Sequence, residues 1–329
     1  MSELVGHSQP VGRLDRTSGH RLRVLGETGA RTAIMALGIC AVTLVGCSSS
    51  QIITPVAPTP VSSTVYQDKL RSANIAVAAA MDRFATARSP EQARAGLEQA
   101  FGAVGEAAQL LEITPPVEVQ AVHRDLLAGL RQLAVDLSHL RDQAMSKTLC
   151  AGPSVVAAVS NGPGMIRLRS VRDVLGSGRA GVSYQWGDSL PAVVQLPERR
   201  LVNGQLIDSR KRGGRGQLRV DNGLGHDAVV ELVQDGKPVV SVYLGTGLTT
   251  TVDDIEDGSY ELFYTSGIDW DGQLKTFTRS CSFKRVPLPV SFTTVPMEGA
   301  VRSTTQVIGL RDKTGEGART TVPGQSFPR

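Results

Sequence analysis

The sequence predicts an α+β protein, in which an antiparallel helical bundle precedes an all-β sandwich. Hydrophobic residues recur at three- and four-residue steps from Tyr66 to Leu140, which is the period of an amphipathic helix. After Gln217 they alternate with polar residues, which is the period of a strand. Of fourteen aromatic residues, three lie between residues 47 and 173 and eight between residues 243 and 292. The two regions are therefore expected to have different cores.

Residues 64–175 are predicted to form three long helices and two short ones, which the short connections make antiparallel neighbours. Ser89, followed by Pro90 and three residues later by Gln92, has the capping-box pattern of a helix start. The third long helix is expected to start at Thr114. The predicted short helices are Ser154–Ser160 and Met165–Leu175. The predicted buried stripes of the three long helices, in chain order, are Tyr66, Leu70, Ala73, Val77, Met81 and Phe84; then Ala93, Leu97, Ala100, Val104, Ala107 and Leu111; and then Val119, Val122, Leu126, Leu130, Leu133, Leu137 and Leu140.

Three further segments follow the helices. Residues 176–216 contain eight glycines and a group of arginines, and they are interpreted as a partly ordered connector. Residues 217–296 are predicted to form six or seven short strands separated by glycine turns, as in a β-sandwich. Residues 297–329 are polar and lack a period, so a disordered tail is expected there.

Charge gives no support for nucleic-acid binding. The chain has 329 residues and a formal net charge of +4. Residues 1–46 hold five arginines and three acids, so only +2 remains for the rest of the chain. A small excess spread over nearly three hundred residues is not the basic patch that a nucleic-acid surface requires. We therefore expect no nucleic-acid partner.

The first 47 residues have the parts of a secretory signal. Five arginines precede an uncharged stretch, Thr32–Gly46, which is too short for a good membrane-spanning helix and ends in Leu44-Val45-Gly46-Cys47. This pattern resembles the signal of bacterial lipoproteins. The resemblance implies a signal peptide over residues 1–46, a lipid on Cys47 and an anchor on the outer face of the cell membrane. Residues 47–63, rich in Ser, Thr and Pro, then act as a tether. An uncleaved anchor helix or a plain signal peptide is the alternative.

Two cysteines remain once the signal is set aside. Cys40 would be removed with the signal and Cys47 used for lipid, which leaves Cys150 and Cys281. An even pair in an extracytoplasmic chain favours a disulfide between them. Two separately buried thiols are the alternative, and no Cys-x-x-Cys pattern points to a metal site.

The strand region carries a pattern that resembles an uncharacterised β-module of bacterial envelope proteins. The residues that carry it are Asp227-Ala228-Val229-Val230, Ser241-Val242-Tyr243, Asp257-Gly258-Ser259-Tyr260 and Asp269-Trp270-Asp271. The resemblance covers about a quarter of the chain and implies no known activity. One hypothesis for this region is a ligand face made of Tyr243, Tyr264 and Trp270, exposed aromatic side chains that stack on cell-wall glycan.

The short motifs for catalysis and cofactor binding lack the neighbouring residues and secondary structure that these functions require. Gly187-Asp188-Ser189-Leu190 matches the string of the GDSL esterases, but Ser189 has no later histidine except His226 and no α/β domain around it. The Gly-x-Gly-x-x-Gly run at residues 176–181 lacks the strand and helix of a dinucleotide site. We therefore predict no cofactor and no catalytic residue. His123 and His139 are expected on helix flanks, without zinc spacing.

Calcium is the remaining metal hypothesis. Five acids could gather at one end of the strand region: Asp253, Asp254, Asp257, Asp269 and Asp271. Their spacing is not that of an EF-hand, and Asp and Gly are also the residues that tight turns require. We therefore predict no metal site.

Three functional hypotheses follow. The first is a non-enzymatic, membrane-anchored envelope lipoprotein that binds an envelope protein partner or serves as a scaffold. The second is a lipoprotein that binds cell-wall glycan or another ligand. The third is an envelope hydrolase that uses Ser189.

Overall fold

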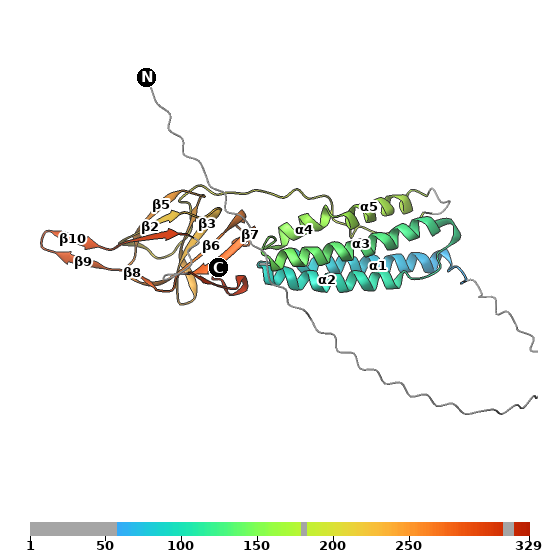
Figure 1. The fold of residues 1–329 in the computed structure, drawn as a ribbon, viewed down its shortest axis with the longest axis horizontal. Coiled ribbons are helices and arrows are strands. Elements are labelled where there is room, and N and C mark those ends of the chain that lie inside the picture. The colour runs from blue at the N-terminus through green and yellow to red at the C-terminus, as the bar shows by residue number, and fades with distance from the viewer. Residues whose placement is uncertain (1–57, 179–182, 312–318) are drawn as a thin grey trace, which may run out of the picture. The chain divides into compact units, whose positions relative to one another are not determined.

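The computed structural model describes residues 58–178, 183–311 and 319–329. The predicted signal, Cys47 and most of the predicted tether lie outside the described residues. The described chain is an α+β protein, with five α-helices followed by a region rich in antiparallel strands (Figure 1). We call these the helical region and the β region. None of the described helices is both long enough and apolar enough to cross a membrane.

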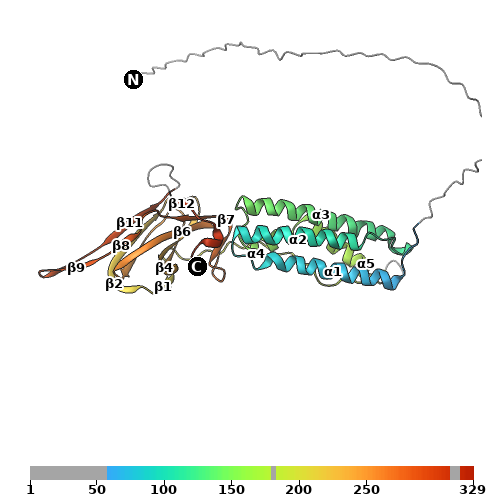
Figure 2. The ribbon, with the colours of Figure 1, turned by 90° about the horizontal axis from the view of Figure 1, so that it is seen from below.

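The helical region begins within two residues of the predicted position. Its elements are α1 (Ser63–Ala85), α2 (Pro90–Leu110), the 3-10 helix η1 (Val117–Val119), α3 (Gln120–Met145), α4 (Gly152–Ser160) and α5 (Pro163–Gly176). Helix α2 packs against both α1 and α3, while α3 also contacts α5 and α1 contacts α4. Figures 1 and 2 show the long helices lying alongside one another.

Local chain chemistry sets where these helices start. The Ser89 hydroxyl accepts a hydrogen bond from the Gln92 backbone N–H, as in the predicted capping box, whereas the Gln92 side chain accepts from the backbone N–H of Arg88 rather than from that of Ser89. The predicted start of the third helix at Thr114 was wrong, because α3 begins at Gln120. Pro116 is extended with ψ of 146°, and the proline pair keeps the preceding residues out of the helical conformation.

The helical core is built largely from small and aliphatic side chains. The predicted stripes are buried along most of their length, and Tyr184, Trp186 and Leu190 from the segment after α5 join the same core. Small residues allow close helix contacts. A Cβ atom on Gly96 of α2 would lie 2.5 Å from the Arg83 carbonyl oxygen of α1, so a larger residue there would push the two helices apart.

The β region contains three sheets. The strands are β1 (Leu206–Ser209), β2 (Arg212–Asn222), β3 (Asp227–Gln234), β4 (Lys237–Leu244), β5 (Thr249–Ile255), β6 (Gly258–Asp271), β7 (Thr276–Arg285), β8 (Val290–Phe292), β9 (Thr294–Met297), β10 (Ala300–Ser303), β11 (Thr305–Leu310) and β12 (Thr320–Thr321). The largest sheet has the order β1-β4-β3-β6-β7-β12, with β8 also paired to β6. A second sheet has the order β11-β2-β5, and β9 and β10 form a two-stranded sheet of their own.

Both faces of the central sheet are covered. Along β3, Val230 and Leu232 belong to one hydrophobic core, whereas Val229 and Val233 belong to another. This alternation is expected when successive strand residues point to opposite faces. The second core contains Tyr243 of β4, Phe263 and Trp270 of β6, and Phe277 and Phe283 of β7, whereas Tyr260 and Tyr264 of β6 belong to the first core.

Two predicted boundaries of the β region were wrong. Residues 206–216 were assigned to a connector in which Gln205–Ile207 was considered a possible strand, but they form β1 and the start of β2. Residues 297–329 were expected to form a disordered tail, but they contain β10, β11, β12 and a short 3-10 helix, η2 (Gly324–Ser326). Strand β11 pairs with β2 in parallel, with Thr305 opposite Gln217. Pairing with a distant strand, rather than a local apolar pattern, holds these polar segments in strands.

Candidate functional site

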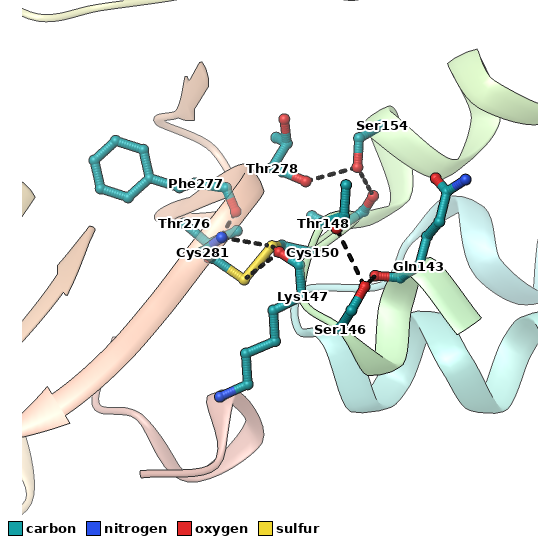
Figure 3. Close-up of a disulfide and its surroundings, with 12 residues drawn as sticks. Gln143, Ser146, Lys147, Thr148, Cys150, Ser154, Thr276, Phe277, Thr278 and Cys281 are labelled. Atoms are coloured by element: carbon teal, nitrogen blue, oxygen red, sulfur yellow. Dashed lines mark hydrogen bonds between the residues drawn. A yellow bond between two sulfur atoms is a disulfide. The ribbon is translucent and has the colours of Figure 1, made fainter. Parts of the chain in front are cut away.

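A disulfide joins the helical region to the β region. Cys150 lies between α3 and α4, Cys281 lies in β7, and their Cα atoms are 6.1 Å apart. This distance is within the usual range for a bridged pair. The predicted disulfide between these two cysteines is therefore confirmed (Figure 3).

Hydrogen bonds continue this joint on both sides of the disulfide. The Cys150 N–H donates to the Thr278 carbonyl at 2.8 Å, and the Cys281 N–H donates to the Lys147 carbonyl at 3.1 Å. The Ser154 hydroxyl of α4 donates to the same Thr278 carbonyl at 2.7 Å (Figure 3). Residues 147–150 thus follow the β7 backbone like a short additional strand.

A second contact between the two regions comes from residues 319–329. The Gly324 N–H donates to the Glu91 carboxylate of α2 at 3.2 Å. Phe327 is buried, and its ring centroid lies 5.3 Å from that of Phe283 in β7. This segment therefore packs against helix α2 and covers the aromatic face of the sheet.

The hypothesis of an aromatic ligand face was wrong. Tyr243, Tyr264 and Trp270 are only 1%, 1% and 2% exposed. Tyr264 belongs to one core and the other two to the core on the opposite face of the sheet. The Trp270 ring packs edge-on against Phe277, with centroids 5.1 Å apart. In this arrangement the three side chains stabilise the sheet and have no common surface to offer a sugar.

Arginines neutralise the acids near Trp270. Arg199 donates from Nε and Nη2 to the two oxygens of Asp269, each at 2.8 Å, and from Nη1 to Asp271 at 2.9 Å. Burial alone would raise the pKa of Asp269, but the hydrogen bonds from Arg199 and Thr278 lower it. The network fastens the segment before β1 to the end of β6.

Asp227 at the start of β3 is held in a similar way. Arg200 Nε donates to its carboxylate at 2.7 Å, and Tyr243 and Thr246 donate as well. Burial opposes ionisation, but these hydrogen bonds outweigh it and lower the pKa of Asp227 to about 2. Asp227 therefore stays charged and anchors the Arg200 segment.

The five acids considered for calcium do not form one set. Asp253 accepts a hydrogen bond from Gln217, Asp254 pairs with Arg212, and Asp257 bonds to β9. Asp269 and Asp271 are bound by an arginine instead. Across residues 58–178, 183–311 and 319–329, no group of three or more His, Cys, Asp or Glu side chains is placed to hold a metal ion.

Ser189 lies in a loop that packs on α1. Its hydroxyl accepts a hydrogen bond from Trp186 Nε1 at 3.3 Å, and its backbone N–H donates to Asn74 at 3.4 Å. Within the described chain, no histidine is hydrogen-bonded to this hydroxyl. His226 lines a different depression, together with Arg200 and other polar residues. The contacts seen for Ser189 therefore hold the loop in place and supply no base to activate a nucleophile.

His123 was expected on a helix flank, and this expectation was wrong. The side chain is 3% exposed, and its Nδ1 lies 3.2 Å from the Tyr66 hydroxyl. Burial lowers the pKa of His123, with an opposing contribution from the Leu111 backbone. His123 lies four residues after Val119 and three before Leu126, both on the predicted buried stripe, so its spacing is that of a core residue. Its polarity led to the wrong assignment.

Strands β9 and β10 form an exposed hairpin. Every residue of β10 and most of β9 is exposed, including Val295 at 51%, Met297 at 53% and Val301 at 47%. Figures 1 and 2 show the hairpin extending beyond the neighbouring strands. Ala300 lies opposite Met297, and Arg302 lies opposite Val295. Because directly opposite residues share a face, one face of the hairpin carries Val295, Met297, Ala300 and Arg302.

Sequence reasoning missed this hairpin. The segment was assigned to the end of the sandwich and the start of a tail, because it is short and mostly polar. The available signal was two brief β-branched runs on either side of Glu298-Gly299, with Gly299 in the left-handed conformation at φ of 72°. We refer to residues 294–303 as the hairpin below.

Comparison with known proteins gives no relative. No family model matches the chain, and neither a curated protein nor a solved structure is significantly similar to it.

Proposed function

We propose that this protein is a non-enzymatic envelope lipoprotein that binds an envelope protein partner through the hairpin. In this proposal Cys47 carries the lipid and residues 47–63 act as a tether at the outer face of the cell membrane. We interpret the helices as an antiparallel bundle and the strands as a sandwich, joined by the Cys150–Cys281 disulfide. The protein serves as a support that presents the hairpin to its partner.

The exposed apolar face of the hairpin is the observation that carries this proposal. A two-stranded hairpin on its own is marginally stable in water, and exposed valine and methionine add nothing to its stability there. Val295, Met297 and Ala300 share one face and are exposed together. Such a surface gains free energy when a partner covers it.

The hairpin also indicates the chemistry of the partner. Arg302 lies on the apolar face and has no ion-pair partner among the described residues. An apolar groove bordered by a carboxylate would cover the valine and methionine and pair with the guanidinium group. We therefore expect a protein partner with such a groove, rather than a glycan.

Substitutions on the two faces of the hairpin test the proposal. Val295→Ser combined with Met297→Ser removes the apolar face, and we expect chemical crosslinking in intact cells to lose its partner band. Val301→Ser is the matched control, because Val301 is exposed on the opposite face and should leave the band unchanged. Equal loss from both variants, or no loss from either, would overturn the assignment of this face.

The proposed lipid anchor at Cys47 has its own test. Cys47→Ala should leave an unprocessed precursor that takes up no labelled fatty acid. A variant that is still cut and lipidated would show that the cysteine is not the anchor. This outcome is independent of the hairpin variants, so the two parts of the proposal can fail separately.

The hydrolase hypothesis makes a different prediction. It requires that an active-site serine probe label the protein and that Ser189→Ala abolish the labelling. We expect no labelling at Ser189, because its hydroxyl accepts from the Trp186 indole and its backbone N–H donates to Asn74, and neither group can take a proton from the hydroxyl.

A further inference from the structure

A pocket lies between α1, α4 and the loop that carries Ser189. Its accessible volume is about 360 Å³, within the range of small-molecule sites. The apolar part of its lining comes from helices α1 and α4 and from the loop: Ala78, Met81, Phe84, Ala85, Val156, Val159 and Pro191. The polar part consists of Asp82, Asp188 and Ser189.

Hydrogen bonds fix the loop on its α1 side. The Gln67 side chain donates to the Gln185 carbonyl at 2.8 Å and accepts from the Gln185 N–H at 2.9 Å. Asn74 accepts from the Ser189 N–H. Trp186 and Leu190 of the same loop are buried. This wall of the pocket is therefore held by α1 before any ligand arrives.

Further hydrogen bonds fix the loop on its other side. Arg169 of α5 donates to the Pro191 carbonyl at 2.8 Å. Asn161, at the end of α4, donates to the Val194 carbonyl at 2.8 Å, and the Val194 N–H donates to Ser160 at 3.1 Å. A loop held at both ends loses little conformational entropy when a ligand binds, which favours affinity.

The charge of the lining selects the ligand. Asp82 and Asp188 are exposed, and neither has an ion-pair partner among the residues that the structure describes. No lysine or arginine lines the pocket, and the neighbouring Arg83 donates to Gln99 instead. Two unpaired carboxylates above an apolar floor disfavour an anion and favour a cation with an apolar body.

We infer that this pocket binds a small amphipathic organic cation, whose protonated amine lies near Asp82 and Asp188 and whose apolar part enters between α1 and α4. This inference goes beyond the hairpin proposal and does not depend on it, because the two sites share no residue.

Alkylammonium ions of increasing length are the probe. The full chain, purified in a non-ionic detergent, is titrated with butyl-, pentyl- and hexylammonium, and with hexanol and hexanoate as neutral and anionic controls. Trp186 fluorescence reports binding, because its indole bonds to Ser189, and a Trp270→Phe background removes the chain's other tryptophan. We expect affinity to rise about fourfold with each methylene that is buried, and hexylammonium to bind more tightly than hexanol or hexanoate.

Variants separate the charged and apolar parts of the site. Asp82→Asn and Asp188→Asn should each weaken hexylammonium binding about threefold, as expected for exposed charges. Glu106→Gln, which removes an exposed acid on α2 outside the pocket, should change nothing. Ala78→Phe should abolish binding by filling the pocket, with circular dichroism as the check on folding.

Two results would overturn the inference. One is equal binding of hexylammonium, hexanol and hexanoate, which would mean that the carboxylates do not select the ligand. The other is hexylammonium binding that survives both Asp82→Asn and Asp188→Asn undiminished. Both aspartates are exposed, so these variants test the inference even if Ala78→Phe fails to fold.

Discussion

The helical region and the β region are stabilised in different ways. Helices α1, α2 and α3 pack against their neighbours in the sequence, and their core consists mainly of alanine and leucine. The β region instead pairs distant segments, such as β11 with β2, and places aromatic rings in the cores on both faces of its sheet. Its order therefore depends on contacts that no short stretch of sequence contains. The disulfide and residues 319–329 link the two regions.

Removing the disulfide is expected to have the largest effect on stability and on the coupling between the two regions. Cys150→Ala combined with Cys281→Ala opens a crosslink that spans 131 residues. The chain-entropy model then predicts a loss of about 4–5 kcal/mol in the free energy of unfolding. Urea denaturation in a Trp186→Phe background measures this loss, with far-ultraviolet circular dichroism following the helices and the fluorescence of Trp270 following the β region. We expect the two signals to separate in the variant. Coincident transitions at unchanged urea concentration would show that the joint does not couple the regions.

The segment that covers the aromatic face should come next. Phe327→Ala removes a buried ring that contacts Phe263 and Phe283, with an expected cost of about 3 kcal/mol. Phe101→Ala is the control, because Phe101 is 43% exposed on α2 and should cost less than about 0.5 kcal/mol. Equal effects of the two substitutions in thermal denaturation would mean that residues 319–329 do not stabilise the β region.

The helical region was the more predictable of the two. Serine caps and the 3.6-residue period act over a few positions, so Ser89 and the buried stripes were identified correctly from the sequence. Two expectations failed: two prolines displaced the start of α3 to Gln120, and His123 is buried rather than on a helix flank. Tyr184 and Trp186 also join the helical core from outside the helices, which no periodicity could have indicated.

The β region was predictable only where apolar residues are dense. Strands β3, β4 and β6 were recognised from their apolar and alternating runs. Strands β10 and β11 were missed, because their residues are mostly exposed and a distant strand or a hairpin partner decides their conformation. Of the site residues, the disulfide followed from counting cysteines, whereas the burial of Tyr243, Tyr264 and Trp270 depends on which sheet face each occupies.

A buried glutamate makes the β region sensitive to pH. Glu231 of β3 is 3% exposed, and burial raises its pKa from 4.5 to about 8, although Arg329 and Lys275 oppose the shift and Asp208 adds to it. The folded chain then holds a proton that the unfolded chain releases, so stability falls as the pH rises from about 4.5 to about 8.

Glu231→Gln should remove this dependence. We expect the variant to be more stable than the parent at pH 9, by up to about 5 kcal/mol, and to differ little from it at pH 4. Urea denaturation at the two pH values measures the difference. If the difference in stability between the parent and the variant is the same at pH 4 and at pH 9, the raised pKa of Glu231 is contradicted. The helical signal should change less than the β signal if the two regions respond separately.

The smallest expected effect concerns the helix cap. Ser89→Ala removes the hydroxyl that accepts from Gln92, which should cost about 1 kcal/mol and act on the helical region alone. Ser89→Thr is the matched control, because its hydroxyl can make the same hydrogen bonds without burying a second carboxylate beside Glu91. Thermal denaturation followed by circular dichroism checks both variants, and equal destabilisation by alanine and threonine would show that the cap is not the stabilising element.

Site-specific photocrosslinking in intact cells tests the central claim most directly. A photoreactive residue at Met297 probes the apolar face of the hairpin, and one at Val117 probes an exposed apolar position of the helical region. Binding through the hairpin predicts a discrete protein adduct from position 297 and none from position 117. An adduct from position 117 alone, or none from position 297, would contradict the proposal that the β region presents the hairpin to a protein partner.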